Sequence, residues 1–194
     1  MKALVKCSTG PGDLCITEMP EPQAGPGQVK VRVAHCGVCG TDLRIWDGHY
    51  HLKPPIIPGH EVSGIVTGVG QGVTGVVTGM RVTCETIVNQ CGRCEYCLQG
   101  RYQLCPSHLG MGTRHNGGFA EYVVIPEQNA YPLPDGVSLE EGALVEPLAC
   151  AVYSVFDSER APVGGAALVI GPGPVGLMVS RLASLHGAAV GYAA

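Results

Sequence analysis

The chain has 194 residues, enough for one domain of ordinary size or slightly more. Hydrophobic residues make up 45% of it and charged residues 14%, a balance that supports a packed core and excludes a largely disordered chain. The net charge of −4, without a basic cluster, argues against nucleic acid as a main partner. No apolar run approaches the roughly 18 residues that a membrane-spanning helix needs, and the N-terminus has no signal-peptide pattern. We therefore expect a cytoplasmic protein with no membrane partner.

Ten cysteines are many for a chain of this length. Without a secretion signal, clustered cysteines favour metal ligation over disulfides. The first two, Cys7 and Cys15, lie in residues 1–16, which we expect to form two short strands around a turn at residues 9–13. Neither has ligand-like neighbours, so both are predicted to be buried, unreactive thiols.

Residues 28–34 alternate apolar and polar side chains, which predicts a half-buried strand. Glycines end this strand, and Cys39, Thr41 and Asp42 follow at its end, before a short helical turn at residues 43–46. A thiolate, a hydroxyl and a carboxylate at a strand end suit a metal site with a proton-relay group beside it. A surface turn with unreactive thiols is the alternative.

A second group of ligand-type residues follows a stiff, proline-rich segment at residues 54–58. It consists of His60 and Glu61, at the start of a strand predicted for residues 62–69. A histidine and a glutamate in this position are the obvious partners for Cys39, and we predict that they bind a metal together with it.

The strongest signal is a group of four cysteines that comes soon after a strand predicted at residues 81–84. Its members are Cys91, Cys94, Cys97 and Cys105. Four thiolates at such short spacing can complete a tetrahedral Zn²⁺ shell with no open position, which is a structural site. A redox or disulfide cluster is the alternative.

Residues 138–156 are predicted to form a helix, with Ser138 as the N-cap and Glu141 completing a capping box. Pro147 is expected to kink or interrupt this helix. Beside it, Glu146 lies among apolar residues, where a carboxylate is costly to bury unless it is paired or bound to a metal. A carboxylate on the helix surface is the alternative.

Residues 164–170 read as a buried strand that runs into a glycine-rich turn and then a helix to about residue 186. This context is the one that dinucleotide binding requires, because the glycines allow a tight turn and a close approach of a pyrophosphate to the helix N-terminus. A purely structural strand–turn–helix is the alternative. The residues predicted to contact the cofactor are Gly171, Gly173, Pro174, Val175 and Gly176.

Taken together, these motifs resemble the N-terminal part of the zinc-dependent medium-chain alcohol dehydrogenases, in the branch with sorbitol and threonine dehydrogenases. The resemblance implies a β-rich, partly open barrel like chaperonin-10 (GroES-like) at residues 1–155, with a zinc lobe at about residues 88–108. The first βα unit of a Rossmann domain would follow at residues 156–194. The resemblance is carried, in the family's order, by residues 39–42, 59–61, the four cysteines, residues 117–122, Glu146 with Pro147, and the glycine motif.

The resemblance also implies an activity, the reversible oxidation of a secondary alcohol, a polyol or an amino alcohol, with hydride transfer to NAD or NADP. It implies two Zn²⁺ per chain, one in the four-cysteine lobe and a catalytic one. The catalytic zinc would be held by Cys39, His60 and a carboxylate from Glu146 or Glu61. Full-length relatives are expected to be homo-oligomers, dimers or tetramers.

In the same scheme Thr41 takes the alcohol proton, and Asp42 hydrogen-bonds the second ring nitrogen of His60 and sets its tautomer. One residue departs from the family pattern: Arg44 stands where many relatives carry a histidine that passes the proton on. Arginine stays charged and cannot shuttle a proton at neutral pH. A water-based or slower relay would then be needed.

Two other functions are compatible with the sequence. The first is a zinc-stabilised domain or fragment without catalysis, because one βα unit cannot enclose a dinucleotide; we therefore expect weak or absent NAD(P) binding by a chain of this length. The second is a thiol redox protein that uses Cys36 and Cys39. The particular alcohol, and the choice between NAD and NADP, are not determined by the sequence.

Overall fold

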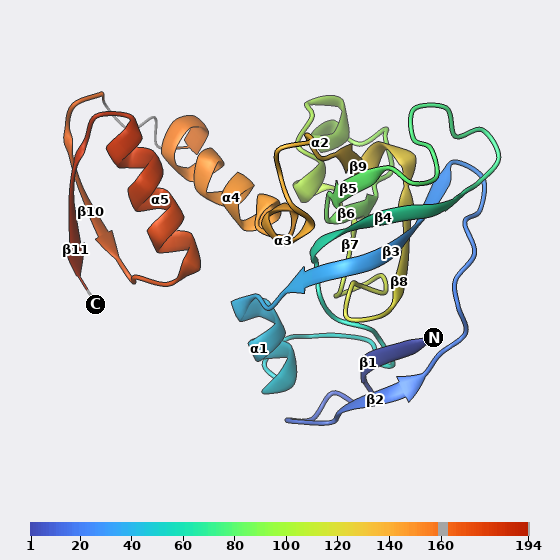
Figure 1. The fold of residues 1–194 in the computed structure, drawn as a ribbon. Helices are drawn as coiled ribbons and strands as arrows, with labels where there is room; N and C mark the ends of the chain where they lie inside the picture. Colours follow the sequence, from blue (N-terminus) through green and yellow to red (C-terminus); the bar gives the residue numbers. More distant parts are fainter. Residues whose placement is uncertain (159–162, 194) are drawn as a thin grey trace. The chain divides into compact units, whose positions relative to one another are not determined.

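The structure is a computed structural model that describes residues 1–158 and 163–193. The chain divides into two compact units, Met1–Ala143 and a second that begins at Leu144 (Figure 1). The division falls just before helix α4 (Val145–Val152), earlier than the boundary predicted after residue 155. The assignment of the two units as catalytic and nucleotide-binding domains stays a prediction.

An antiparallel five-stranded sheet forms the body of the first unit, in the order β8-β3-β4-β5-β9. The strands predicted at residues 28–34, 62–69 and 81–84 are all present, and the first of them extends further than predicted, to Gly37. The bounds are β3 (Gln28–Gly37), β4 (Glu61–Val69), β5 (Arg81–Cys84), β8 (Tyr122–Pro126) and β9 (Ala130–Pro132), with a short 3-10 helix η2 (Glu127–Asn129) before β9.

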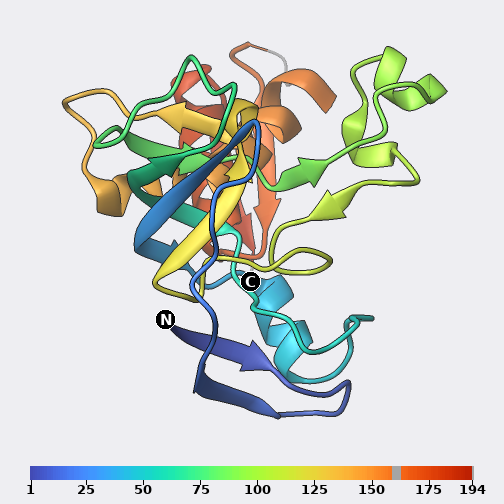
Figure 2. The ribbon, with the colours of Figure 1, turned by 90° about the vertical axis from the view of Figure 1, so that its right-hand side faces the viewer.

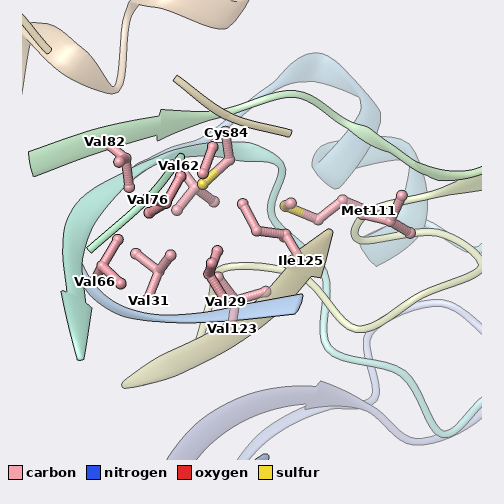
Figure 3. Packing of buried hydrophobic residues seen from close by; sticks show 12 residues of the cluster. Val29, Val31, Val62, Val66, Val76, Val82, Cys84, Met111, Val123 and Ile125 are labelled. Carbon is pink, nitrogen blue, oxygen red and sulfur yellow. The ribbon is translucent and has the colours of Figure 1, made fainter. Parts of the chain in front are cut away.

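The sheet curves around one hydrophobic cluster, shown in Figure 3. The alternation predicted for β3 is confirmed at its start, because Val29 and Val31 are fully buried while Gln28 and Lys30 are not. Removal of these apolar side chains from water is the main force that holds the curved sheet together. Their partners in the cluster include Val62, Val66, Val82, Cys84, Met111, Val123 and Ile125.

The N-terminal residues form the predicted hairpin of β1 (Lys2–Lys6) and β2 (Leu14–Glu18). Single bridges from Ala3 to Ala120 and from Lys6 to Ile56 connect β1 to the rest of the unit. The predicted burial of Cys7 and Cys15 is wrong, since both are exposed. The rest of the unit covers the hairpin at Ala3 and Val5, which pack with Ile57, but leaves its turn end, where the two cysteines lie, exposed to solvent.

The four cysteines lie in a lobe whose base is closed by the antiparallel pair β6 (Ile87–Asn89) and β7 (Leu109–Gly110). Between these strands the chain forms two short helices, α2 (Glu95–Leu98) and the 3-10 helix η1 (Tyr102–Leu104). Figure 2 shows this yellow-green segment projecting away from the sheet. The buried side-chain amide of Asn129 donates to the carbonyl oxygens of Glu85 and Ile87 and so fixes the base of the lobe.

The segment predicted as one helix over residues 138–156 is divided. It consists of α3 (Leu139–Gly142), α4 (Val145–Val152) and a π-helical turn η3 (Tyr153–Ser158). The break lies before Pro147 rather than at it. Pro147 is the third residue of α4, where the missing N–H has no helical acceptor to lose, so the proline fits the start of a helix. The capping box of Ser138 and Glu141 is confirmed.

The second unit contains a β–α–β element made of β10 (Ala166–Ile170), α5 (Pro174–Leu185) and β11 (Ala189–Ala193). The two strands pair in parallel, as the strands on either side of a crossover helix do. The strand and helix expected around the glycine motif are therefore present. The predicted burial of the strand is wrong, because Leu168 and Ile170 are exposed: no described element covers both faces of this two-stranded sheet. Within the described residues, no helix combines the length and the apolar character needed to cross a bilayer.

Candidate metal centres

The first candidate centre consists of Cys39, His60 and Glu61, whose ligand atoms all lie within 4.8 Å of one another. Antiparallel pairing of β3 with β4 places Gly37 opposite Glu61 and so brings the ends of the two predicted segments together. Cys39 is the N-cap of helix α1 (Gly40–Trp46), which begins as β3 ends. Cys39, His60 and Glu61, which the sequence predicted to bind a metal together, therefore lie close together in the first unit.

Two glycines make this arrangement possible. A Cβ on Gly37 would collide with the carboxylate of Glu61, so only glycine leaves that side chain its place. Gly59 has φ +89°, a backbone conformation that favours glycine, and a Cβ there would lie 2.7 Å from the ring of Phe119 and 2.9 Å from Cys36 Sγ. The segment that carries Cys39 and the segment that carries His60 and Glu61 (the two ligand segments) therefore each need a glycine, Gly37 and Gly59, at a position with no room for a side chain.

Asp42 holds the two ligand segments together through their main chains. Its Oδ2 accepts a hydrogen bond from the N–H of Cys39 (2.9 Å), and its Oδ1 accepts one from the N–H of Gly59 (3.2 Å). The side chain is buried, with 6% exposure, so these hydrogen bonds are shielded from water. The predicted contact of Asp42 with the His60 ring stays a prediction.

This main-chain role of Asp42 was not anticipated from the sequence, although a signal for it exists. Asp42 is three residues after the N-cap Cys39, the spacing at which a capping-box side chain reaches back to the N-cap amide. Thr41 lies in the first turn of α1 and is half-buried, and Arg44 in the same helix is exposed. Their parts in proton transfer stay predictions.

The thiol of Cys36 lies close to this centre but has different chemistry. Burial, and then the negative charges of Asp42 and Glu61, raise the pKa of Cys36 well above its usual range. The thiolate is the reactive form of cysteine, so this environment suppresses nucleophilic and redox chemistry at Cys36. It weighs against the thiol redox function that pairs Cys36 with Cys39.

The second candidate centre is the cysteine lobe. The Sγ atoms of Cys91, Cys94, Cys97 and Cys105 all lie within 4.8 Å of one another. With Zn–S bonds of about 2.3 Å, the sulfur atoms of a regular tetrahedral site are about 3.8 Å apart. The Sγ atoms of Cys91 and Cys97 are separated by 3.9 Å, so the donor set and its spacing fit Zn²⁺.

The thiols of the cysteine lobe differ in how readily they ionise. Hydrogen bonds from the main-chain N–H groups of Arg93 and Cys94 lower the pKa of Cys91 to about 6. Burial, and then the hydrogen bond with Cys94, raise the pKa of Cys97 to about 12. Amides directed at sulfur stabilise a thiolate, and a bound cation would supply the positive charge that Cys97 needs in order to ionise.

Glu146 lies in the first turn of α4, in the second unit, and is half-buried. The thiol of Cys150, one helical turn further on, approaches its Oε1 at 3.9 Å. Because Glu146 and Cys39 belong to different units, ligation of the catalytic zinc by Glu146 stays a prediction.

The glycine motif lies at the end of β10 and the start of α5, where it lines an open hollow of about 650 Å³. Gly171 has φ +94°, which allows the tight turn, and a Cβ on Gly176 would collide with the carbonyl oxygen of Gly171. Gly173, the N-cap of α5, has no atom within 4 Å of its Cβ position and leaves room for a ligand. Pro174 and Val175 line the same hollow. Tight turns that bind dinucleotides use glycines in the same way, and contact of these residues with a cofactor stays a prediction.

Comparison with known protein families agrees with this geometry. The alcohol dehydrogenase GroES-like domain profile matches residues 25–135, which include the five-stranded sheet and both candidate metal centres of the first unit. The chain belongs to the alcohol dehydrogenase GroES-like domain family. The predicted GroES-like fold and the predicted family resemblance are confirmed.

Relatives of this GroES-like chain include the sorbitol dehydrogenase of Halalkalibacterium halodurans, 42% identical over 98% of the chain and 55% of the relative. The L-threonine 3-dehydrogenase of Streptomyces coelicolor is 40% identical, over 97% of the chain and 55% of the relative. Among solved structures, a zinc-binding dehydrogenase of Sinorhizobium meliloti bound to NADP superposes with a TM-score of 0.90 at 36% identity, covering 98% of this chain and 55% of that one. The chain thus spans about 55% of the length of these relatives.

Proposed function

We propose that this chain carries the metal-binding and alcohol-binding part of a zinc-dependent dehydrogenase that oxidises a secondary alcohol of a polyol or amino alcohol with NAD(P). The observation that carries the proposal is the convergence of Cys39, His60 and Glu61 within 4.8 Å, at the end of β3 and the start of β4. Similarity to a sorbitol and a threonine dehydrogenase supports the substrate class.

A Zn²⁺ held by Cys39, His60 and a carboxylate would lower the pKa of the substrate hydroxyl. The hydroxyl of Thr41, two residues after Cys39, is proposed to accept the proton that the substrate loses and to pass its own proton on to water. Asp42 keeps the main chains of the two ligand segments at a fixed separation, so the ligands are positioned before the metal binds. The four-cysteine lobe is proposed to hold the second zinc as a structural ion.

The cofactor part of the proposal rests on the glycine motif. The N-terminus of α5 presents main-chain N–H groups and the positive end of the helix dipole, which suit a pyrophosphate. The open space at Gly173 admits that close approach. A bound nicotinamide would supply the hydride acceptor, and the protein's contribution is to orient it.

Metal stoichiometry tests the proposal. Elemental analysis of the purified chain should find two zinc ions, Cys39→Ser should remove one, and Cys97→Ser should remove the other. In the cobalt-substituted chain, the visible bands of the first centre are those that remain in Cys97→Ser and are absent in Cys39→Ser. Added sorbitol or threonine should shift these bands. One zinc that survives Cys39→Ser, with no alcohol response, would refute an alcohol-binding metal centre.

A second candidate function is a zinc-binding domain without catalysis. It is favoured by the position of both groups of candidate metal ligands, which lie within the first unit alone. An assay of NAD⁺ reduction by sorbitol or threonine, monitored by the absorbance of the reduced nicotinamide, distinguishes the dehydrogenase from the non-catalytic domain. Two zinc ions with no hydride transfer and no NAD(P) binding by calorimetry would favour the non-catalytic domain.

A further inference from the structure

Two exposed thiols meet near the turn of the N-terminal hairpin. Cys7 Sγ and Cys15 Sγ are 2.8 Å apart, and both residues are exposed. The separation is only about 0.8 Å longer than a disulfide bond, and shorter than the contact distance of two unbonded thiols. The two sulfur atoms are in direct contact, so a disulfide bond would require only a small movement of the two side chains.

The strand register explains why these two side chains meet. Cys15 pairs with Val5, and the N–H of Cys7, which directly follows the end of β1, donates to the carbonyl oxygen of Asp13. Cys7 and Cys15 are therefore diagonal neighbours on one face of the hairpin, a relation that strong twist in a two-stranded ribbon shortens. Alternation along a strand places both side chains on the same side.

We propose that Cys7 and Cys15 are a reversible disulfide site, oxidised by small-molecule disulfides such as oxidised glutathione. This site is separate from both candidate metal centres, whose ligands lie elsewhere in the chain. It requires neither zinc nor nicotinamide cofactor, so its test is independent of the proposed dehydrogenase function.

The exchange proceeds in two steps that balance. One thiolate attacks a sulfur of oxidised glutathione, forms a mixed disulfide and releases one glutathione thiolate. The second hairpin thiol, once deprotonated, attacks the protein sulfur of the mixed disulfide and releases the second glutathione. The two protein thiols lose two protons and two electrons, and oxidised glutathione becomes two molecules of glutathione. The hydrogen bond with Cys15 raises the pKa of Cys7.

The disulfide would close a loop that is anchored to helix α1. Lys6, which is buried with 1% exposure, donates through Nζ to the carbonyl oxygens of Gly10 and Gly12 in the turn and of Trp46 at the end of α1. The N–H of Gly12 also donates to the Trp46 carbonyl oxygen, at 2.7 Å. Figure 2 shows the dark blue hairpin beside the cyan α1. Oxidation would therefore restrain the turn against the helix that follows Cys39.

Peptide mapping of the zinc-loaded chain tests the site directly. Trypsin releases residues 7–30 as one peptide whose only cysteines are Cys7 and Cys15. Equilibration with glutathione buffers of rising oxidised fraction should convert this peptide from doubly alkylated to unalkylated, with the loss of two hydrogens. Excess reduced glutathione should restore the alkylation. Cys150→Ser, at an exposed cysteine of the second unit, should leave this titration unchanged.

Stability and exchange measurements test the consequence. Closing a loop of nine residues should raise the thermal unfolding midpoint by about 5–10 °C. The double variant Cys7→Ser/Cys15→Ser should show no such rise in the same buffers. Hydrogen–deuterium exchange should slow at residues 8–14 and 43–48 on oxidation.

Four results would count against the proposal: the first two would overturn the disulfide itself, and the last two its stabilising effect and its link to α1. A peptide that stays doubly alkylated at every glutathione ratio would show that the thiols do not join. Separate glutathione adducts on Cys7 and Cys15, without the internal disulfide, would show the same. A midpoint rise that persists in the double variant would assign the effect to other cysteines, and unchanged exchange at residues 43–48 would remove the link to α1.

Discussion

Replacement of Gly59 by alanine is the sharpest test of how the first metal centre is built. Gly59 precedes His60, has φ +89°, and gives its N–H to Asp42. A Cβ at this position would lie 2.7 Å from the Phe119 ring and 2.9 Å from Cys36 Sγ, closer than real side chains come. We expect Gly59→Ala to destabilise the first unit and to displace His60 from its metal-binding position.

The magnitude has two parts. An alanine in the left-handed region costs about 1–2 kcal/mol in backbone strain. Forcing a methyl group into a packed site costs a further 1–3 kcal/mol, approximately. The two add to about 2–5 kcal/mol of unfolding free energy. Gly72, with φ +84° and no atom within 4 Å of its Cβ position, is the matched control, because Gly72→Ala carries the strain without the collision.

Urea unfolding of the zinc-loaded chain, followed by the fluorescence of Trp46, measures the effect. Trp46 is the single tryptophan and ends α1, so it reports on the unit that contains the site. Gly59→Ala should lose about 1–3 kcal/mol more than Gly72→Ala and should release one zinc to a chelator faster. Equal losses in the two variants, with equal zinc retention, would refute the steric account of this site.

Two further predictions concern the first unit. Ile125→Ala, at a fully buried position of the core cluster, should lower the free energy of unfolding by about 2–5 kcal/mol. Ile16→Ala, at an exposed position of β2, should change it by no more than about 0.5 kcal/mol. Similar losses for the two variants in urea unfolding would contradict the assigned core. Hydrogen bonds from the main-chain N–H groups of Gly75 and Thr74 lower the pKa of Glu127 in the folded chain. The ionised carboxylate therefore stabilises the fold fully above the usual glutamate pKa of about 4.3, and this contribution is lost as the pH falls through the lowered pKa. The stability difference between wild type and Glu127→Gln should therefore shrink in acid, and a difference independent of pH would exclude this role.

Several features of this protein are determined by short stretches of sequence. The four cysteines lie within fifteen residues, so local chain geometry alone can bring their sulfur atoms together, and the predicted cluster is present. The glycine motif is equally local, since a tight turn and a helix start depend on neighbouring residues. The alternation of Val29 and Val31 placed them in the core because a strand has only two faces.

Other features depend on contacts between residues far apart in the chain. The burial of Cys7 and Cys15 was predicted wrongly because exposure depends on what packs over a strand, which the strand's own residues do not state. The helix break before Pro147 was misplaced for a similar reason: proline is compatible with a first turn, and its neighbours alone do not show where that turn begins.

The types of metal ligand were therefore determined by the sequence, and their assembly by the tertiary structure. Cys39 and His60 could be named as candidates from their chemistry and from the strands beside them. Only the register of β3 on β4 set Gly37 opposite Glu61, and only the fold brought the Asp42 carboxylate to the main chains of both ligand segments. Strand register and hydrogen bonds over long sequence separations are properties of the packed chain, because a shift of one residue would reverse every side chain of a strand.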